Sequence, residues 1–430
     1  MDLVTSTETK KELRGLCFEI IKLFFGVELD FENDIEQIPE YIDMLGITIK
    51  DILVSEKKDQ YLQKYMDIAE SIDFDYLQDI FQEFKKDRKN LNQDYTPKSA
   101  AKLLAELVYY KEARTVYDVC CGSGSLSIAL HNIDKDLNFV CWEYDENVIP
   151  YLLFNLAIRN INAVVIRGDI FTGETFDFYE LKQSTKFSDV SIIENYKLGE
   201  FDICVSNPPF NVKGIKITNT EGFNVDVNND SNSFFVNHLL KHSKKRAAII
   251  FPMSFEFSTA KGAIATRKYI IDNRLLTNLV KMPEKLFEYT TIVTDIVILD
   301  KENKDYTMHF LDAKNWSSFR IRDLRGSYGG KSHTNRVYHK KFSDFSDENI
   351  TQIKELIEEG EGIEGKCGAA VYDTIKARDY NLSFKINCPE PEEEKHFRSY
   401  AEIFADLANL FKEEKESIEN ISRMINKESA

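Results

Sequence analysis

The tetrapeptide Asn207-Pro208-Pro209-Phe210 combines groups that could do chemistry at one turn of the chain. It follows a short apolar run, residues 201–206, which predicts a buried strand closed by a turn. The two prolines fix φ twice and remove two backbone donors, and the residue before a proline is kept out of the helical region. The predicted loop is stiff and presents an amide, carbonyl acceptors and an aromatic ring. Two acceptors beside a flat ring suit a planar base that carries an exocyclic amine.

A glycine-rich turn, Cys121-Gly122-Ser123-Gly124, lies between a predicted strand over residues 115–120, which contains Asp118, and a predicted helix. Glycines let the backbone approach a ligand closely, and a helix N-terminus favours negative charge. Glu143 ends the next predicted strand, about 20 residues past the turn, where an acid suits the two hydroxyls of a ribose. These features fit either NAD or S-adenosylmethionine.

Asp169 follows a third predicted strand, residues 163–167, and has apolar neighbours. It could accept a hydrogen bond from an adenine amine while Ile170 or Phe171 packs on the ring. Three successive predicted strands thus end at or near an acid, and the fourth ends at the Asn-Pro-Pro-Phe turn. Each acid alone also suits a helix cap or a surface position, but the series favours one ligand site.

The segment Tyr95-Thr96-Pro97 precedes a predicted helix over residues 98–110. Thr96 is a good N-cap, and Pro97 suits the first turn. The free N–H groups of such a helix start could also hold a carboxylate.

The order of apolar runs and turn signals predicts an α/β chain with a largely parallel, doubly wound sheet over residues 95–312. A helix is expected at 8–25 and a second helical pattern at 57–90, and further strands at 247–251, 276–281, 292–299 and 307–311. We therefore predict four parts: an N-terminal helical domain (1–91), the sheet domain (92–312), a basic loop and extension (313–390) and a C-terminal helix (391–430).

Residues 211–232 are rich in Asn, Asp, Thr and Gly and predict a mobile loop. Because this loop directly follows the turn at Asn207, it suits a lid that orders on substrate.

A cluster of cations in residues 319–341 stands out from the acidic chain. The segment contains several Lys and Arg residues and a single acidic residue, Asp323. This composition suits either a solvated surface loop or a flexible segment that contacts DNA phosphates. The candidate DNA-contacting residues are Arg320, Arg322, Arg325, Lys331 and Arg336.

Residues 391–430 predict an acidic helix with a coiled-coil seam, which Glu414 interrupts. The seam either packs within this chain or bundles with a partner. Its residues are Tyr400, Phe404, Leu407, Phe411, Ile418 and Ile421.

Composition limits the classes of function that are open. The 430 residues carry a net charge of −17, which suits poorly a protein that must hold DNA alone. The seven cysteines form no CxxC pair, so we expect free thiols and no metal site. No apolar run reaches the ~18 residues of a membrane span, and we expect a cytoplasmic protein.

Taken together, the motifs resemble the modification (methylation) subunit of type I restriction-modification systems, a family of N6-adenine DNA methyltransferases. The likeness runs from about Tyr95 to about Asn387. It rests on the segments at 95–97, 118–124 and 207–210 together with Glu143, Asn155-Leu156-Ala157, Gly168-Asp169, Met282-Pro283-Glu284-Lys285-Leu286-Phe287 and Asp379-Tyr380-Asn381-Leu382-Ser383.

The resemblance implies a Rossmann-like, S-adenosylmethionine-dependent methyltransferase sheet with an N-terminal helical domain and a C-terminal helical extension. The glycine turn and Thr96-Pro97 would hold the methionine part of the cofactor. Glu143 would take the ribose, and Asp169 the adenine amine. Double-stranded DNA would be the substrate, and a flipped adenine would enter the turn at Asn207. A separate specificity subunit would read the sequence, because no part of the chain predicts a large recognition domain; a restriction or translocase subunit would be a further partner.

The residues also suggest how the transfer would occur. The adenine amine is a poor nucleophile, and the Asn207 side-chain oxygen and the Pro208 carbonyl could each accept one of its N–H groups, while Phe210 stacks on the ring. A dehydrogenase would share the glycine turn but not the Asn-Pro-Pro-Phe turn. A protein-glutamine methyltransferase and a catalytically silent assembly subunit remain alternatives.

Overall fold

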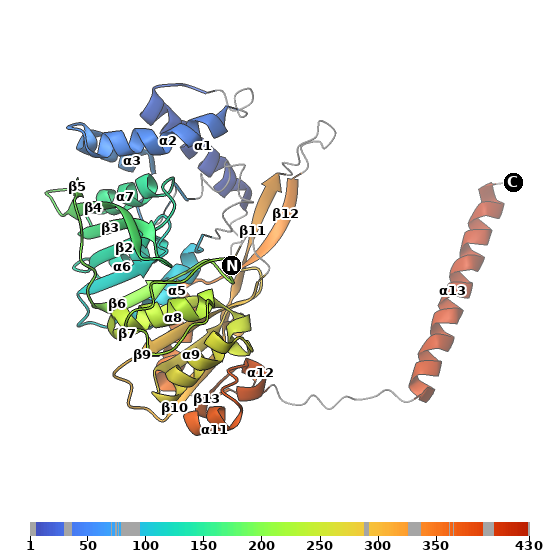
Figure 1. The fold of residues 1–430 in the computed structure, drawn as a ribbon. Coiled ribbons are helices and arrows are strands. Elements are labelled where there is room, and N and C mark those ends of the chain that lie inside the picture. Colours follow the sequence, from blue (N-terminus) through green and yellow to red (C-terminus); the bar gives the residue numbers. More distant parts are fainter. Residues whose placement is uncertain are drawn as a thin grey trace. The chain divides into compact units, whose positions relative to one another are not determined.

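The computed structural model describes residues 6–29, 37–69, 71–73, 75, 77–78, 95–287, 292–325, 337–360, 362–363, 365–389 and 400–428. The chain divides into two compact units, Met1–Pro389 and Glu390–Ala430. The first unit is built around one large sheet (Figure 1). Its strands are β1 (Thr115–Val119), β2 (Asn138–Glu143), β3 (Ala163–Asp169), β4 (Glu174–Lys182), β5 (Asp189–Ile193), β6 (Phe201–Ser206), β7 (Ser243–Pro252), β8 (Leu276–Lys281), β9 (Thr294–Asp300), β10 (Thr307–Asp312) and β13 (Cys367–Val371).

The strand order is β13-β10-β8-β9-β7-β6-β1-β2-β3-β4-β5. The five central strands, from β7 to β3, run parallel, which confirms the predicted α/β sheet. β9 is antiparallel to both of its neighbours, and β4, β5 and β13 make antiparallel edges. β1 is flanked by β2 and by β6, so the chain winds away from it in both directions. Such a reversal opens a crevice at the carboxyl ends of the strands.

One expected connection is wrong. The strand that ends at Asn207 was expected to be the fourth along the chain, but β4 and β5 intervene before it. β4 pairs antiparallel with β3 at the sheet edge, and most of its residues are exposed or half-buried. A strand of this kind lacks the apolar run that identified the central strands. β6 then returns to the middle of the sheet beside β1.

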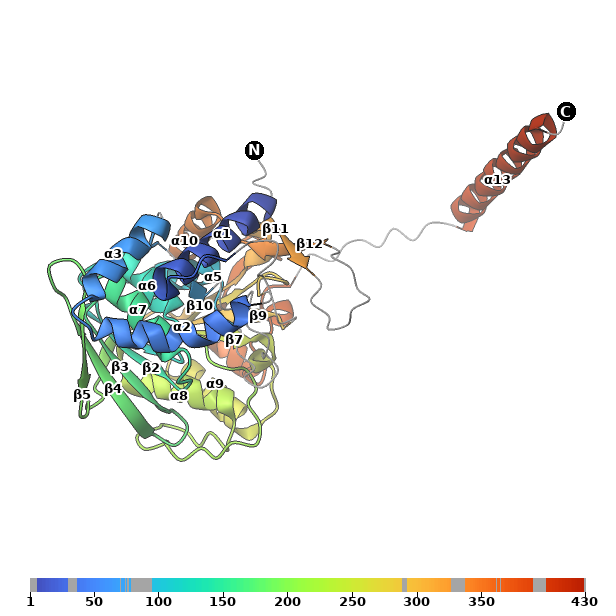
Figure 2. The same ribbon diagram turned by 90° about the horizontal axis from the view of Figure 1, so that it is seen from above.

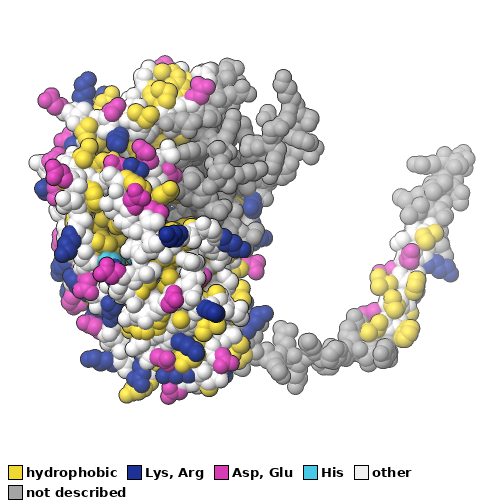
Figure 3. Space-filling model, in the orientation of Figure 1, with side chains coloured by type: hydrophobic (Ala, Val, Ile, Leu, Met, Phe, Trp, Pro, Cys, Tyr) yellow, Lys and Arg dark blue, Asp and Glu magenta, His cyan; other side chains and the backbone are white. Residues whose placement is uncertain are grey.

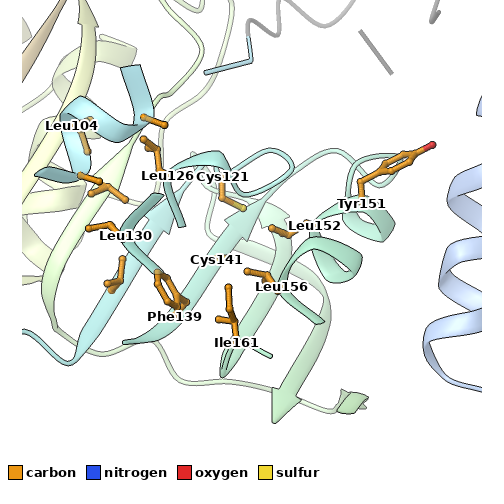
Figure 4. Close-up of a cluster of buried hydrophobic side chains, with 14 of the residues drawn as sticks. Leu104, Cys121, Leu126, Leu130, Phe139, Cys141, Tyr151, Leu152, Leu156 and Ile161 are labelled. Atoms are coloured by element: carbon orange, nitrogen blue, oxygen red, sulfur yellow. The ribbon is translucent and has the colours of Figure 1, made fainter. Parts of the chain in front are cut away.

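Helices cover both faces of the sheet and form two separate apolar cores. One face carries α5 (Lys98–Val108), α6 (Ser125–Ile133) and α7 (Ile149–Ile158). In Figure 4, leucines of these three helices point toward Phe139 and Cys141 of β2. The other face carries α8 (Ser231–His242), α9 (Lys261–Asp272) and α11 (Tyr372–Ala377).

The N-terminal helices α1 (Ser6–Phe25), α2 (Ile38–Leu53) and α3 (Lys58–Ala69) pack on α7 (Figure 2). The helix predicted at 8–25 is confirmed, while α2 was not predicted. The pattern at 57–90 is seen as a helix to Ala69, and residues 79–94 lie outside the described residues. Phe154 of α7 contacts the rings of Phe24 and Tyr65, with centroids 6.1 and 4.8 Å away. These contacts explain why all ten residues of α7 are buried.

The basic segment is not a simple loop. β11 (Ser318–Arg325) and β12 (Val337–Asp344) form an antiparallel hairpin, with Ser318 opposite Asp344 and Arg325 opposite Val337. Arg320, Arg322 and Arg325 lie on β11, and Lys331 and Arg336 lie outside the described residues. The short helix η2 (Ala313–Trp316) precedes the hairpin, and α10 (Asp347–Glu359) follows it; α12 (Phe384–Asn387) ends the first unit.

The second unit contains α13 (Tyr400–Glu428). Four residues of the predicted seam are exposed: Phe404, Leu407, Phe411 and Ile418, by 69, 43, 67 and 57%. Figure 3 shows apolar side chains along the described part of this helix. The side chains of Tyr400 and Ile421 lie outside the described residues. Across the described chain, no helix has both the length and the apolar character to cross a bilayer.

A buried pair of carboxyl groups lies at the carboxyl edge of the sheet, away from β1. Glu256 ends the short helix η1 (Met253–Glu256), and Asp295 is the second residue of β9. Each is 1% exposed, and their side chains hydrogen-bond to one another. Burial raises the pKa of Glu256 to about 7 and that of Asp295 well above its usual range. The pair therefore holds a proton at neutral pH.

This pair makes stability depend on pH. A carboxyl whose pKa is higher in the folded state stabilises the fold at low pH, and that contribution is lost as the pH rises through about 7. We expect Glu256→Gln to be more stable than wild type at pH 8 by roughly 1–3 kcal/mol, and to differ little at pH 5. Urea unfolding at the two pH values measures the difference. The exposed Glu358→Gln is the matched control, and equal pH dependence in wild type and Glu256→Gln would contradict the assignment.

Candidate functional site

A cavity of about 380 Å³ opens at the carboxyl ends of β1, β2, β3 and β6, in the crevice beside β1. It brings together most of the residues that the sequence singled out. Those in its wall are Tyr95, Thr96, Cys121, Gly122, Ser123, Glu143, Asp169, Ile170, Phe171, Asn207, Pro208, Pro209 and Phe210. Three candidates, Pro97, Asp118 and Gly124, are not part of the wall.

Glu143, at the end of β2, is oriented by the backbone around it. Its Oε2 accepts a hydrogen bond from Gly122 N at 2.8 Å, and its Oε1 accepts from Tyr144 N and Asp145 N, both at 2.9 Å. Burial raises the pKa of this carboxyl, and the three N–H donors act against that shift. The side chain is thereby fixed in direction, and its oxygens can still accept from ligand hydroxyls.

The glycine turn requires its glycines at two positions. Gly122 has φ +56° and Gly124, the N-cap of α6, has φ +95°. Side chains rarely adopt this left-handed region. The turn is further held by Asn155 of α7, whose Nδ2 donates to the Ser123 carbonyl at 2.9 Å.

Gln78 connects the N-terminal region to this turn and was not predicted. Its Oε1 accepts from Ser123 Oγ at 3.1 Å and from Ser125 Oγ at 2.6 Å. Its Nε2 lies 3.5 Å from the Thr96 carbonyl, on the other side of the cavity mouth. A buried amide that joins segments 18 and 45 residues farther along the chain leaves no local signal, so the sequence could not identify it.

Asp118 lies behind the cavity instead of in its wall. It is fully buried, and its Oδ2 accepts from Ser127 N at 3.1 Å and Ser127 Oγ at 2.7 Å. Burial raises its pKa to about 7. These bonds fix the start of α6 against β1, so Asp118 shapes the turn from below.

Asp169 is the last residue of β3 and begins the turn that forms one end of the cavity. Its Oδ1 accepts from Phe171 N at 2.9 Å. The Phe171 ring packs on Phe234 and Phe235 of α8, with centroid distances of 5.0 and 5.3 Å. A carboxylate and two apolar side chains, Ile170 and Phe171, thus meet at one end of the cavity.

Asn207 faces the same cavity from the end of β6. The preceding residue, Ser206, donates its Oγ to the Val119 carbonyl at 2.6 Å, which ties β6 to β1 just before the turn. Asn207 Nδ2 donates to Thr96 Oγ1 at 2.9 Å. The expectation that Thr96 caps the following helix is wrong, because the N-cap of α5 is Pro97, with no side-chain cap bond. Thr96 instead orients the amide.

Phe210 closes the turn on its outer side. Its ring is half-buried and meets Phe287 edge-on, with centroids 6.5 Å apart and an interplanar angle of 81°. Phe287 ends the segment that starts at Met282, so two of the motifs noted in the sequence meet here. The partly exposed ring can still offer a face to a planar ligand.

Several wall residues were not predicted: Cys120, Ser125, Trp142, Tyr144, Val148, Gly168, Ile215 and Phe235. Trp142 and Tyr144 flank Glu143, and aromatic residues at the tip of a buried strand are a signal that could have found them. Ile215 and Phe235 come from the 211–230 loop and from α8, where only the fold reveals their direction.

Comparison with known proteins decides the family. A family model described as N-6 DNA Methylase matches residues 74–396. The chain belongs to this family. The resemblance read from the sequence motifs is therefore confirmed at the family level.

Curated relatives include two type I restriction enzyme methylase subunits of Methanocaldococcus jannaschii. The MjaVIII subunit is 26% identical over 343 residues, which cover 76% of this chain and 54% of that protein. The MjaVII subunit is 24% identical over 439 residues, covering 98% and 70%. The chain thus spans about half the length of the first relative and about two thirds of the second.

A solved structure shares the fold. The methyltransferase subunit of a type I restriction-modification system from Streptococcus thermophilus has a TM-score of 0.55 and 17% identity. The match covers 88% of this chain and 79% of that one. At this identity the likeness concerns the fold, and it agrees with the α/β architecture predicted from the sequence.

Proposed function

We propose that this chain is the methylating subunit of a type I restriction-modification complex. It transfers a methyl group from S-adenosylmethionine to the N6 amine of an adenine flipped out of double-stranded DNA. The observation that supports this most directly is that Glu143, Asp169 and Asn207 face one cavity. A diol-binding acid, an amine-binding acid and an acceptor amide are the groups that the two substrates need.

The cavity fits the cofactor in its chemistry. Glu143, held by three N–H donors, takes the ribose hydroxyls, and the end formed by Asp169, Ile170 and Phe171 takes the adenine. The turn at Gly122, which leads into α6, takes the charged amino-acid end together with Tyr95 and Thr96. Bound there, S-adenosylmethionine supplies an electrophilic methyl group.

Asn207 and Pro208 act on the target amine. Because Asn207 Nδ2 donates to Thr96, the amide presents its oxygen as the acceptor for one amine N–H. The Pro208 carbonyl accepts the other, which draws the nitrogen toward a tetrahedral form. Positive charge that develops on the nitrogen meets these fixed dipoles. Phe210 stacks on the extruded base and offsets part of the few kcal/mol that unstacking costs.

Asn207→Ala tests the role of the turn. We expect methyl transfer to fall by roughly 100-fold or more, because one preorganised acceptor is lost. Affinity for S-adenosylmethionine should change little, since Glu143 and Asp169 are untouched. Transfer of labelled methyl groups to duplex DNA gives the rate, and the fluorescence of Trp142, which lines the cavity, gives the affinity.

The exposed Asn224→Ala in the following loop is the control for Asn207→Ala. Turnover of the Asn207 variant close to wild type would contradict the proposal. A protein-glutamine methyltransferase would share the Asn-Pro-Pro turn, and methylation of protein instead of DNA in the same assay would favour that alternative. Failure to bind the cofactor would favour a silent assembly subunit.

We also propose that the β11–β12 hairpin contacts DNA phosphates. It is the basic part of an acidic chain, with Arg320, Arg322 and Arg325 on one strand. The Arg320 guanidinium lies 5.5 Å from the centroid of the buried Phe342 ring, which anchors the stem of that side chain. Arginines in such positions would bind the DNA backbone through their charge without distinguishing one base sequence from another.

Replacing the three arginines of β11 by alanine should weaken DNA binding by the assembled enzyme. The slope of log affinity against log salt should fall by up to about 3, because each lost phosphate contact removes roughly 0.9. The control replaces Lys111, Lys182 and Lys304, exposed lysines outside the hairpin, and changes the net charge equally. An unchanged slope in the arginine variant, or an equal change in the control, would contradict this contact.

We propose that α13 docks on the specificity subunit. Its exposed apolar residues recur at the spacing of a coiled-coil seam. The residues of such a seam become buried when they pack against a second helix. Phe404→Glu with Phe411→Glu should abolish co-purification with a co-expressed specificity subunit. Ala405→Glu with Asn409→Glu adds the same charge on the opposite side of the helix and should not. Retention of the complex by the first double variant would contradict the assignment.

A further inference from the structure

The loop at residues 211–230 joins the Asn207 turn to α8, and its two ends are fastened together. Asn232 Nδ2 donates to Asn211 Oδ1 at 2.9 Å, and Ser231 Oγ accepts from Val212 N at 3.0 Å. Farther along, Val227 is buried in the core beneath α8 and α9. Both ends of the loop are therefore held in place, and its middle part lies along the cavity.

The middle of the loop is bonded to the opposite wall of the cavity. Thr218 N and Asn219 N both donate to the Phe171 carbonyl, at 3.0 and 2.9 Å. Asn219 also donates its side-chain Nδ2 to the Ile170 carbonyl at 2.9 Å. One residue, Asn219, thus makes two of the three bonds that hold the loop to the adenine end of the site.

A glycine opposite Asn219 makes this approach possible. Gly173 has φ +78°, and a Cβ built on it would lie 3.3 Å from Asn219 Cγ. A side chain at 173 would be strained and would crowd the amide. The pair is therefore a close contact between the loop and the turn after Asp169.

The bonded segment covers part of the cavity. Ile215, between the two fastened points, lines the cavity together with Ile170 and Phe171. The segment 211–219 consequently connects the wall that would receive the target amine to the wall that would receive the cofactor adenine. An adenosyl ligand bound against Ile170 and Phe171 would also contact Ile215, so its release would depend on this segment.

We infer that Asn219 is a positioning residue that latches segment 211–219 over bound S-adenosylmethionine. The inference rests on the proposed function. The Asn219 hydrogen bonds slow the dissociation of the adenosyl ligand. They also hold the Asn207 turn in a fixed position relative to Ile170 and Phe171. Cofactor exchange then requires the Asn219 bonds to open, while the target base enters on the side of Phe210.

Asn219→Ala tests the latch by cofactor dissociation. The purified full-length chain is loaded with labelled S-adenosylmethionine and chased with unlabelled cofactor. We expect dissociation to be roughly five- to tenfold faster, as the loss of one hydrogen bond predicts. Asn219→Asp, similar in shape but unable to donate to the Ile170 carbonyl, should release the cofactor at least as fast. Asn224→Ala, the same substitution at an exposed position of the loop, should match wild type.

Thermal unfolding of the variants separates a latch from a general loss of stability. Faster release by both Asn219 variants with an unchanged melting temperature supports the inference. Release at the wild-type rate from both, or equal acceleration by Asn224→Ala, would overturn it while leaving the proposed function intact. A wild-type chain that binds no S-adenosylmethionine would overturn the proposed function and the latch together.

Discussion

The site depends on the pairing of β6 with β1 in the middle of the sheet. This pairing places the Asn-Pro-Pro-Phe turn beside the glycine turn, although more than eighty residues separate Ser206 from Val119. The hydrogen bond from Ser206 Oγ to the Val119 carbonyl fixes the two strand ends at the point where both turns begin. Without this adjacency, Asn207 and Glu143 would lie in separate parts of the molecule.

Backbone groups do most of the positioning around the cavity. Glu143 is oriented by three N–H donors and Asp118 by the start of α6, while Thr96 orients Asn207. Rigid elements of this kind hold dipoles in place before a substrate arrives, which is the condition for electrostatic stabilisation of developing charge. The glycine turn receives similar support from the side chains of Gln78 and Asn155, so the N-terminal region and α7 both contribute to its shape.

The central strands and the cavity wall could be predicted because their signals are local. Apolar runs closed by glycine, proline or an acid identified β1, β2, β3 and β6, and parallel strands gather their carboxyl ends at one edge. β4 escaped prediction because an edge strand exposes much of its length. The β11–β12 hairpin was mistaken for a loop because its charge pattern dominated its weak strand signal.

The direction of individual side chains could not be predicted. Asp118 is the second-last residue of β1 and Glu143 the last of β2, yet one points beneath the turn and the other into the cavity. Thr96 had the composition of a helix cap but bonds to Asn207, since the chain places Pro97 at the cap position. Contacts such as that of Gln78 with Ser125 arise only from tertiary packing. Sequence patterns therefore located the wall of the site, and the fold decided which atoms face it.

A structure of the chain with S-adenosylmethionine bound tests the central claim most directly. We expect the ribose hydroxyls on Glu143, the adenine between Asp169 and Phe171, and the methyl group directed toward Asn207. The opposite orientation, with adenine against the Asn207 turn, or binding outside this cavity, would contradict it.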